Sequence, residues 1–221
     1  LRDLISQQAS AGVDIAGDCE LPRIGFSMYV KDRRSGFGGS ASRGTVTDFA
    51  RFPGYAALMA KRMGMDPSKS ASVVPTPECV AAVHYDPKLA RATEELDLFA
   101  AALATEKASA AKLTETFVTA ASPGIISTTL LRNADHPVYQ SDTDYVFAIA
   151  DEMKKEYEAI VARGHVLQLD APDLALERQI MYAGKPLREF LARVELHIEA
   201  INRAVRDIPK DRVRLHVCWG N

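Results

Sequence analysis

The sequence contains little cysteine, a single tryptophan, almost no excess charge and no long hydrophobic run. Its three cysteines, Cys19, Cys79 and Cys218, are too few and too scattered for a disulfide framework, which favours a reducing cytoplasmic setting. Lysine plus arginine number 27 and aspartate plus glutamate 29, so the net charge of −2 supplies no basic field for nucleic acid. The apolar runs fall far short of the ~18 residues of a membrane span, and the opening Leu1-Arg2-Asp3-Leu4 does not have the pattern of a signal peptide. We expect neither a nucleic-acid nor a membrane partner.

The remaining composition is that of a folded protein. Of 221 residues, 47% are hydrophobic and 25% charged, which are globular averages. This length accommodates one large domain or two small ones.

Strand-like and helix-like segments alternate along the chain. Strands are predicted near 13–17, 116–119, 165–169 and 213–218, and amphipathic helices from Asp86-Pro87 to about Ala111 and over 142–163 and 186–205. Residues 35–45, with four glycines and three serines, are predicted to form a loop. The alternation predicts a parallel sheet of βαβ units. Since the chain carries neither a Gly-x-Gly-x-x-Gly nor a P-loop motif, a barrel is favoured over a dinucleotide-binding or P-loop fold.

Polar residues follow the predicted strands, and the carboxyl ends of parallel strands share one edge of a sheet. They are Asp18, Glu20, Ser122, Asp170, His216 and Cys218. The carboxylates could hold a substrate ammonium or serve as acid and base, or they could simply cap helices or be solvated in loops. Ser122, before Pro123-Gly124, is more typical of a helix cap than of a nucleophile.

The sharpest local motif is His216-x-Cys218. Residues i and i+2 of a strand share a face, so an imidazole nitrogen and a thiolate could reach one zinc ion. The alternative is a half-buried histidine and an inert core cysteine. Cys19 could reach the same metal if the sheet curls into a barrel, or could pack in a turn. The remaining candidates have simpler interpretations: Cys79 as structural, Trp219 as a pocket wall or core residue, and His84, His136, His165 and His197 as surface or packing residues.

Taken in order, these segments resemble the cobalamin-independent methionine synthase superfamily, specifically its catalytic C-terminal barrel and shorter bacterial relatives. The resemblance rests on residues 11–20, Ser122-Pro123-Gly124, 167–173 and 216–221. It implies a zinc-dependent (β/α)₈ TIM barrel in which His216 and Cys218 are zinc ligands. It also implies that Glu20 and Asp170, with Asp18 and Ser122 beside them, bind the substrate, whose amino group the carboxylates hold. The implied reaction transfers a methyl group from 5-methyltetrahydrofolate to homocysteine to give methionine.

Two departures keep other functions open. The synthases often have Asp-Glu-Pro where this chain has Asp170-Ala171-Pro172, and a glycine where it has Cys19. The first alternative is a zinc-dependent alkyltransferase in which coenzyme M or another small thiol opens an epoxide. The second is a non-catalytic barrel homologue.

The length sets a further expectation. A barrel of this class needs ≈ 250 residues, so we expect residues 1–221 to form a single catalytic domain that is incomplete at both ends. A third zinc ligand and a general acid would then lie beyond residue 221. An incomplete barrel exposes apolar faces, which would favour a homo-oligomer.

Overall fold

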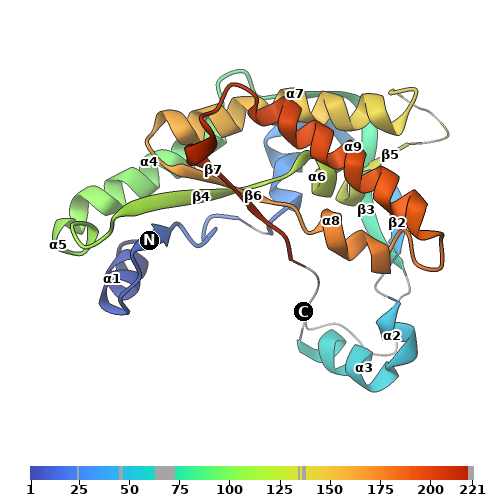
Figure 1. The fold of residues 1–221 in the computed structure, drawn as a ribbon, viewed down its shortest axis with the longest axis horizontal. Helices are drawn as coiled ribbons and strands as arrows, with labels where there is room; N and C mark the ends of the chain where they lie inside the picture. Colours follow the sequence, from blue (N-terminus) through green and yellow to red (C-terminus); the bar gives the residue numbers. More distant parts are fainter. Residues whose placement is uncertain (24, 45–46, 63–72, 134, 136–137, 219–221) are drawn as a thin grey trace.

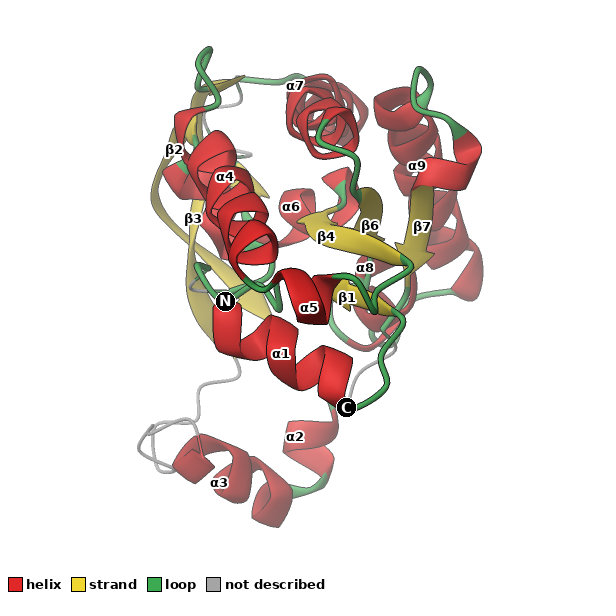
Figure 2. Ribbon diagram, turned by 90° about the vertical axis from the view of Figure 1, so that its left-hand side faces the viewer, coloured by secondary structure: helices red, strands yellow, loops and turns green. Residues whose placement is uncertain are grey.

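A four-stranded parallel sheet forms the centre of the computed structural model, which describes residues 1–23, 25–44, 47–62, 73–133, 135 and 138–218. Its strands are β1 (Ile15–Gly17), β4 (Glu115–Ala121), β6 (Val166–Asp170) and β7 (Val213–His216), in the spatial order β1-β4-β6-β7 (Figures 1 and 2). Each lies where the sequence predicts a strand. However, β7 ends at His216, so the prediction of a strand reaching Cys218 is wrong. Cys218 lies outside the strand, so strand geometry does not place its side chain on the same face as that of His216.

A second, three-stranded sheet corrects the predicted loop. It consists of β2 (Arg34–Gly44), β3 (Val73–Tyr85) and β5 (Leu131–Arg132), with β2 antiparallel and β5 parallel to β3. Residues 35–44 therefore form most of a strand. Gly36 and Gly39 have φ angles of 100° and 56° and lie at the two register shifts between β2 and β3. The glycines allow bulges in a long hairpin, which sequence composition alone does not distinguish from a loop.

Helices connect and cover these strands (Figure 2). They are α1 (Arg2–Ser10), α2 (Asp48–Arg51), α3 (Pro53–Arg62), α4 (Ala90–Thr105), α5 (Lys107–Ala110), α6 (Pro123–Thr129), α7 (Asp142–Ala162), α8 (Asp173–Leu176) and α9 (Leu187–Val205). Short 3₁₀ turns occupy Met28–Asp32, Glu177–Gln179 and Lys210–Arg212. In Figure 1, α2 and α3 lie apart from the rest of the molecule.

Helix α7 organises the core because it contacts strands of both sheets as well as α6 and α9. Its predicted apolar stripe is confirmed as buried: Tyr145, Ile149, Met153, Tyr157 and Ile160. Full burial of one such side chain contributes roughly 1.5–3 kcal/mol. The helix begins with a capping box between Ser141 and Asp144 and stops before Gly164, whose φ of 86° suits glycine.

The mixed α/β architecture and its parallel sheet are confirmed, but the described residues show no closed barrel. Within them, β1 and β7 are the two edges of the central sheet. Apolar side chains on or beside these edges are exposed, namely Ile15, Leu215 and Val217. Among the described helices, none has the combination of length and apolar character that a bilayer span requires.

Candidate functional site at the strand ends

The ends of β4, β6 and β7 are tied together by backbone hydrogen bonds. Asp170 lies opposite His216 in the β6–β7 register. The Ser122 N–H donates to the Asp170 carbonyl at 3.0 Å, and the Ala171 N–H donates to the His216 carbonyl at 2.9 Å. The sheet therefore brings Ser122, Asp170 and His216 together at the carboxyl ends of the strands, as the sequence predicts.

The end of β1 is fixed by a side chain of α1 and then turns sharply. Gln8 bonds both backbone groups of Gly17, its amide donating at 3.0 Å and its carbonyl accepting at 3.1 Å. Cys19 and Glu20 follow with φ angles of 54° and 51°, in the left-handed region that costs a non-glycine residue ~1 kcal/mol. The Glu20 N–H donates to the Asp18 carboxylate at 3.1 Å. Such strain is concentrated at functional sites in many proteins, so this turn is a candidate for one.

The negative charge of the Glu20 carboxylate is poorly compensated by its surroundings. Partial burial raises its pKa, and the neighbouring carboxylates of Asp170 and Asp18 raise it further. Arg23 and His216 oppose these effects but do not cancel them. The interactions with Asp170 and His216 also indicate that the end of β1 faces the ends of β6 and β7.

The Asp170 carboxyl has the same character. Burial raises its pKa, with His216 opposing and Asp173 adding to the rise. Its Oδ1 atom is buried, lies 3.7 Å from the His216 Nε2, and has no hydrogen-bond partner among the described residues. A distance of 3.7 Å is too long for a hydrogen bond. The strand ends therefore contain a buried carboxylate oxygen that has no hydrogen bond among the described residues.

Ser122 lies beneath this edge and caps α6, as the sequence predicts. It is fully buried, accepts the Ile125 N–H at 3.2 Å and donates to Asp173 Oδ1 at 3.0 Å. Asp173 Oδ2 in turn pairs with Nδ1 of His197 at 2.7 Å, with both side chains fully buried. The carboxylate separates serine from histidine, so the arrangement is not that of a nucleophilic triad.

The Asp173–His197 pair is the feature that sequence reasoning missed. The sequence alone indicates only a surface or packing role for His197. A Cβ built on Gly124 would lie 2.1 Å from Asp173 Oδ2 and 2.5 Å from His197 Nδ1. The glycine in Ser122-Pro123-Gly124 was the available signal, because glycine often marks a close approach.

The candidate zinc ligands meet the chemical requirement only in part. His216 and Cys218 offer the nitrogen and sulfur donors that zinc favours, and Cys218 is partly buried. Cys19 is exposed, and the pKa of its thiol is raised by burial and by Asp18 and Glu20, which disfavours a thiolate. Across the described part of the chain, no three His, Cys, Asp or Glu residues are grouped to hold a metal. Trp219, Gly220 and Asn221 lie outside the described residues, as does His136.

Comparison with known proteins supports the fold. No family model matches the chain, and no curated protein does. Among solved structures, a B12-independent methionine synthase from Shewanella sp. W3-18-1, in complex with selenomethionine, matches with a TM-score of 0.62 and 17% sequence identity. The match covers 100% of this chain and 50% of the synthase, so the chain spans about half the length of that structure. At this identity the similarity shows a shared fold.

Proposed function

We propose that this protein is a zinc-dependent methyltransferase of the cobalamin-independent methionine synthase type, acting on homocysteine with 5-methyltetrahydrofolate as methyl donor. The observation that carries the proposal is the pairing of Asp170 with His216 at the strand ends, with Glu20 near enough to interact electrostatically with both and Cys218 two residues after His216. The fold shared with the Shewanella synthase agrees with it.

The carboxylates suit a substrate that carries an ammonium group. Burial raises the pKa of both Glu20 and Asp170, so a cation bound beside them would stabilise their ionised forms. A bound ammonium would supply that charge and donate hydrogen bonds to the carboxylates. Charge-assisted hydrogen bonds of this kind orient a substrate, here placing the thiol beside His216.

Zinc would be held by His216 and Cys218 together with a donor from outside the described residues. When bound, zinc lowers the pKa of a thiol so that the thiolate nucleophile exists at neutral pH. In the overall transfer, a sulfur–carbon bond to the methyl group forms, the nitrogen–carbon bond of the donor breaks, and the leaving nitrogen takes a proton. The part of this chain is to bind the amino acid and direct its sulfur.

Metal analysis of protein purified without chelator tests the proposal. We expect about one zinc per chain, lost in His216→Ala and Cys218→Ala, since a site with three protein ligands depends on each of them. His84→Ala is the matched control, because the His84 side chain is 69% exposed and lies on the other sheet. Stoichiometric zinc in His216→Ala would contradict the metal assignment.

Ala171 favours an alternative reaction, in which a different thiol attacks a different electrophile. It is fully buried and places a methyl group where the synthases often carry a carboxylate. An epoxide:thiol alkyltransferase of the coenzyme M type would use the same zinc ligands but would not need a carboxylate at position 171. Turnover of methyltetrahydrofolate with homocysteine, measured beside turnover of an epoxide with coenzyme M, distinguishes the two reactions.

A further inference from the structure

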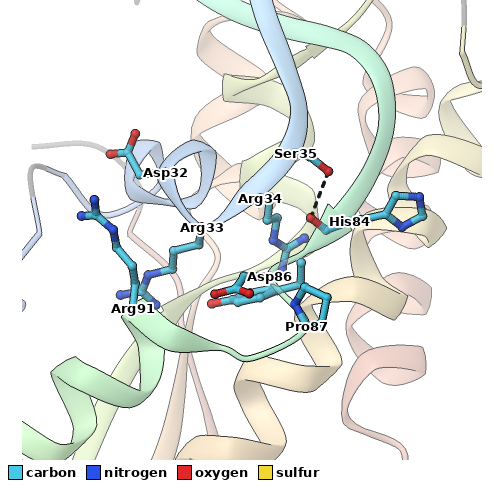
Figure 3. A pocket seen from close by; sticks show the side chains of 9 residues that line it. Asp32, Arg33, Arg34, Ser35, His84, Asp86, Pro87 and Arg91 are labelled. Atoms are coloured by element: carbon cyan, nitrogen blue, oxygen red, sulfur yellow. Dashed lines mark hydrogen bonds between the residues drawn. The ribbon is translucent and has the colours of Figure 1, made fainter.

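Away from the strand ends, the described surface includes a polar cavity whose charges balance. It has a volume of about 470 Å³, lies where β2 begins and β3 ends, and is lined by residues that include Arg34, Arg91, Asp32 and Asp86 (Figure 3). Arg34 also interacts electrostatically with the buried Glu156 carboxylate. Since cations and carboxylates compensate one another there, the cavity does not select a ligand of one charge. The surface of α9 is different, because part of it is apolar.

Helix α9 has a buried face and, beside it, a second face that is apolar but exposed. The helix contacts α6, α7 and α8 through its buried face. The second face carries Leu187, Leu191 and Ile198, which are 57%, 47% and 42% exposed. Val194 lies between them, is partly exposed and does not pack against the hydrophobic core. We call these four residues the α9 stripe.

The α9 stripe is unusual beside the neighbouring helix α7. That helix has 21 residues against 19 in α9, yet none of its large hydrophobic side chains is exposed. Figure 2 shows α9 at the periphery of the molecule, on the side opposite β2 and β3. Several exposed apolar side chains on one face of a peripheral helix indicate an interaction surface.

The spacing of the α9 stripe is that of a coiled coil. Its positions are separated by four, three and four residues, the intervals that keep apolar side chains along the contact line of two packed helices. These intervals are the same in both directions along the helix. Two antiparallel copies of α9 therefore match layer by layer, with Leu187 facing Ile198 and Leu191 facing Val194. Each layer occurs twice about a twofold axis, as an isologous contact requires.

The charges beside the α9 stripe are complementary to themselves in the same arrangement. Arg188 and Glu195 follow Leu187 and Val194 by one position and therefore lie along the same edge of the stripe. Both are exposed, and neither forms an ion pair among the described residues. With the helices antiparallel, Arg188 of one copy lies beside Glu195 of the other, and this contact also occurs twice. Pairs at such positions determine partner and orientation in coiled coils.

We propose that two copies of this protein associate through the α9 stripe, with the two helices antiparallel and related by a twofold axis. The stripe runs from position 187 to position 198, which is about 18 Å of helix. Since a contact of this length is smaller than a standard interface, we expect a dissociation constant on the order of 10 μM. The stripe contains none of the residues proposed to bind substrate or zinc, so the dimer does not depend on the proposed function.

Sedimentation equilibrium of the 221-residue chain over a range of concentrations tests the proposal. We expect a reversible equilibrium between monomer and dimer that Leu191→Glu weakens by about a hundredfold or more, because the contact would then bury two uncompensated carboxylates. Leu98→Glu is the matched control, since Leu98 is 52% exposed but lies on α4, and it should leave the dimer unchanged. Both positions are exposed, so both variants should fold, which circular dichroism checks.

Exchanging the two charges tests the antiparallel orientation. Arg188→Glu and Glu195→Arg each place like charges side by side and should weaken the dimer by about tenfold. The variant that combines them restores opposite charges and should dimerise as the unaltered protein does.

Three results would overturn the proposal. The first is a monomeric unaltered protein, which would mean that something other than a second copy covers the α9 stripe. The second is a dimer that persists in Leu191→Glu, and the third is a combined charge variant no tighter than either single one. Zinc content should be the same in all of these variants, so failure of the dimer and failure of the zinc assignment are distinguishable.

Discussion

The strand-end site and a buried arginine–glutamate cluster, formed by Arg23, Arg33, Glu95 and Glu156, hold their carboxylates in opposite ways. At the strand ends, burial raises the pKa of Glu20 and Asp170, and the charges around them do not compensate. In the cluster, burial acts on Glu156 in the same direction, but Arg33 and Arg23 bring its pKa below the ordinary value. A carboxylate whose partners are all present holds the fold together, whereas one that lacks a partner is a position for a ligand.

The largest expected effect is on stability, from removing the charge at the centre of the cluster. We expect Glu156→Gln to lower the free energy of unfolding by about 3–5 kcal/mol, because Arg33 would keep a buried charge with one carboxylate fewer. Urea denaturation measures the change. Glu158→Gln, on the same helix with a side chain 47% exposed, should change it by no more than about 0.5 kcal/mol. Equal effects of the two variants would mean that the buried ion pair of Glu156 contributes no more to stability than an exposed carboxylate does.

The next largest effect on stability is expected from disturbing the packing beneath the strand ends. Gly124→Ala should destabilise the protein by about 3 kcal/mol, because the new methyl group would overlap Asp173 Oδ2 and His197 Nδ1. Gly54→Ala in α3 is the control. A Cβ there has no neighbour within 4 Å, so the change should be neutral or stabilising by up to ~1 kcal/mol. Thermal unfolding of both variants tests whether the region beneath the site is rigid.

Two helix caps sharpen the comparison further. Ser122→Ala should cost about 2 kcal/mol, since it removes the cap of α6 and the donor to Asp173 Oδ1. Ser141→Ala removes an exposed cap from α7 and should cost about 1 kcal/mol. Chemical denaturation distinguishes the two values. A cost for Ser122→Ala no greater than that for Ser141→Ala would mean that the bond to Asp173 contributes nothing.

The smallest effect is a dependence on pH. Because the pKa of Asp170 is raised in the folded state, its ionised form lowers stability above that pKa. As the pH falls through the raised value toward the ordinary range, the protein regains this stability, and Asp170→Asn should lack that gain. The stability difference between Asp170→Asn and the unaltered protein, followed by thermal unfolding from neutral to acidic pH, should therefore favour the variant most at neutral pH.

Asp151 serves as a control, because its effect on the pH dependence of stability should have the opposite sign. Its bond from Arg203 lowers its pKa, so it contributes stability that is lost as the pH falls below the ordinary range. Asp151→Asn should therefore be weaker than the unaltered protein at neutral pH and converge with it in acid. If both variants show the same slope, the contrast between uncompensated and paired carboxylates does not hold.

Helix periodicity and strand-end polarity were readable from the sequence. The stripe from Tyr145 to Ile160 follows the helical repeat and is buried as predicted. Asp170 and His216 follow apolar strands, and parallel pairing brings them together. Both features depend on local spacing, which a sequence displays directly.

Features that depend on distant partners were not readable. Arg33 pairs with Glu95 and Glu156, whereas Arg34 forms no ion pair among the described residues, and this difference depends on the placement of α4 and α7. The bulges that turn residues 35–44 into a strand depend on pairing with β3. His197 is twenty-four positions from Asp173, and no spacing rule links the two residues.

The contact at Gly124 has a consequence for how such sequences can diverge. Positions 124, 173 and 197 share one small volume, so any side chain at 124 requires the carboxylate and the imidazole to be given up together. Among relatives, these three positions should therefore covary as a unit. Either glycine occurs with Asp and His, or a larger residue occurs where both are absent, and mixed combinations should be rare.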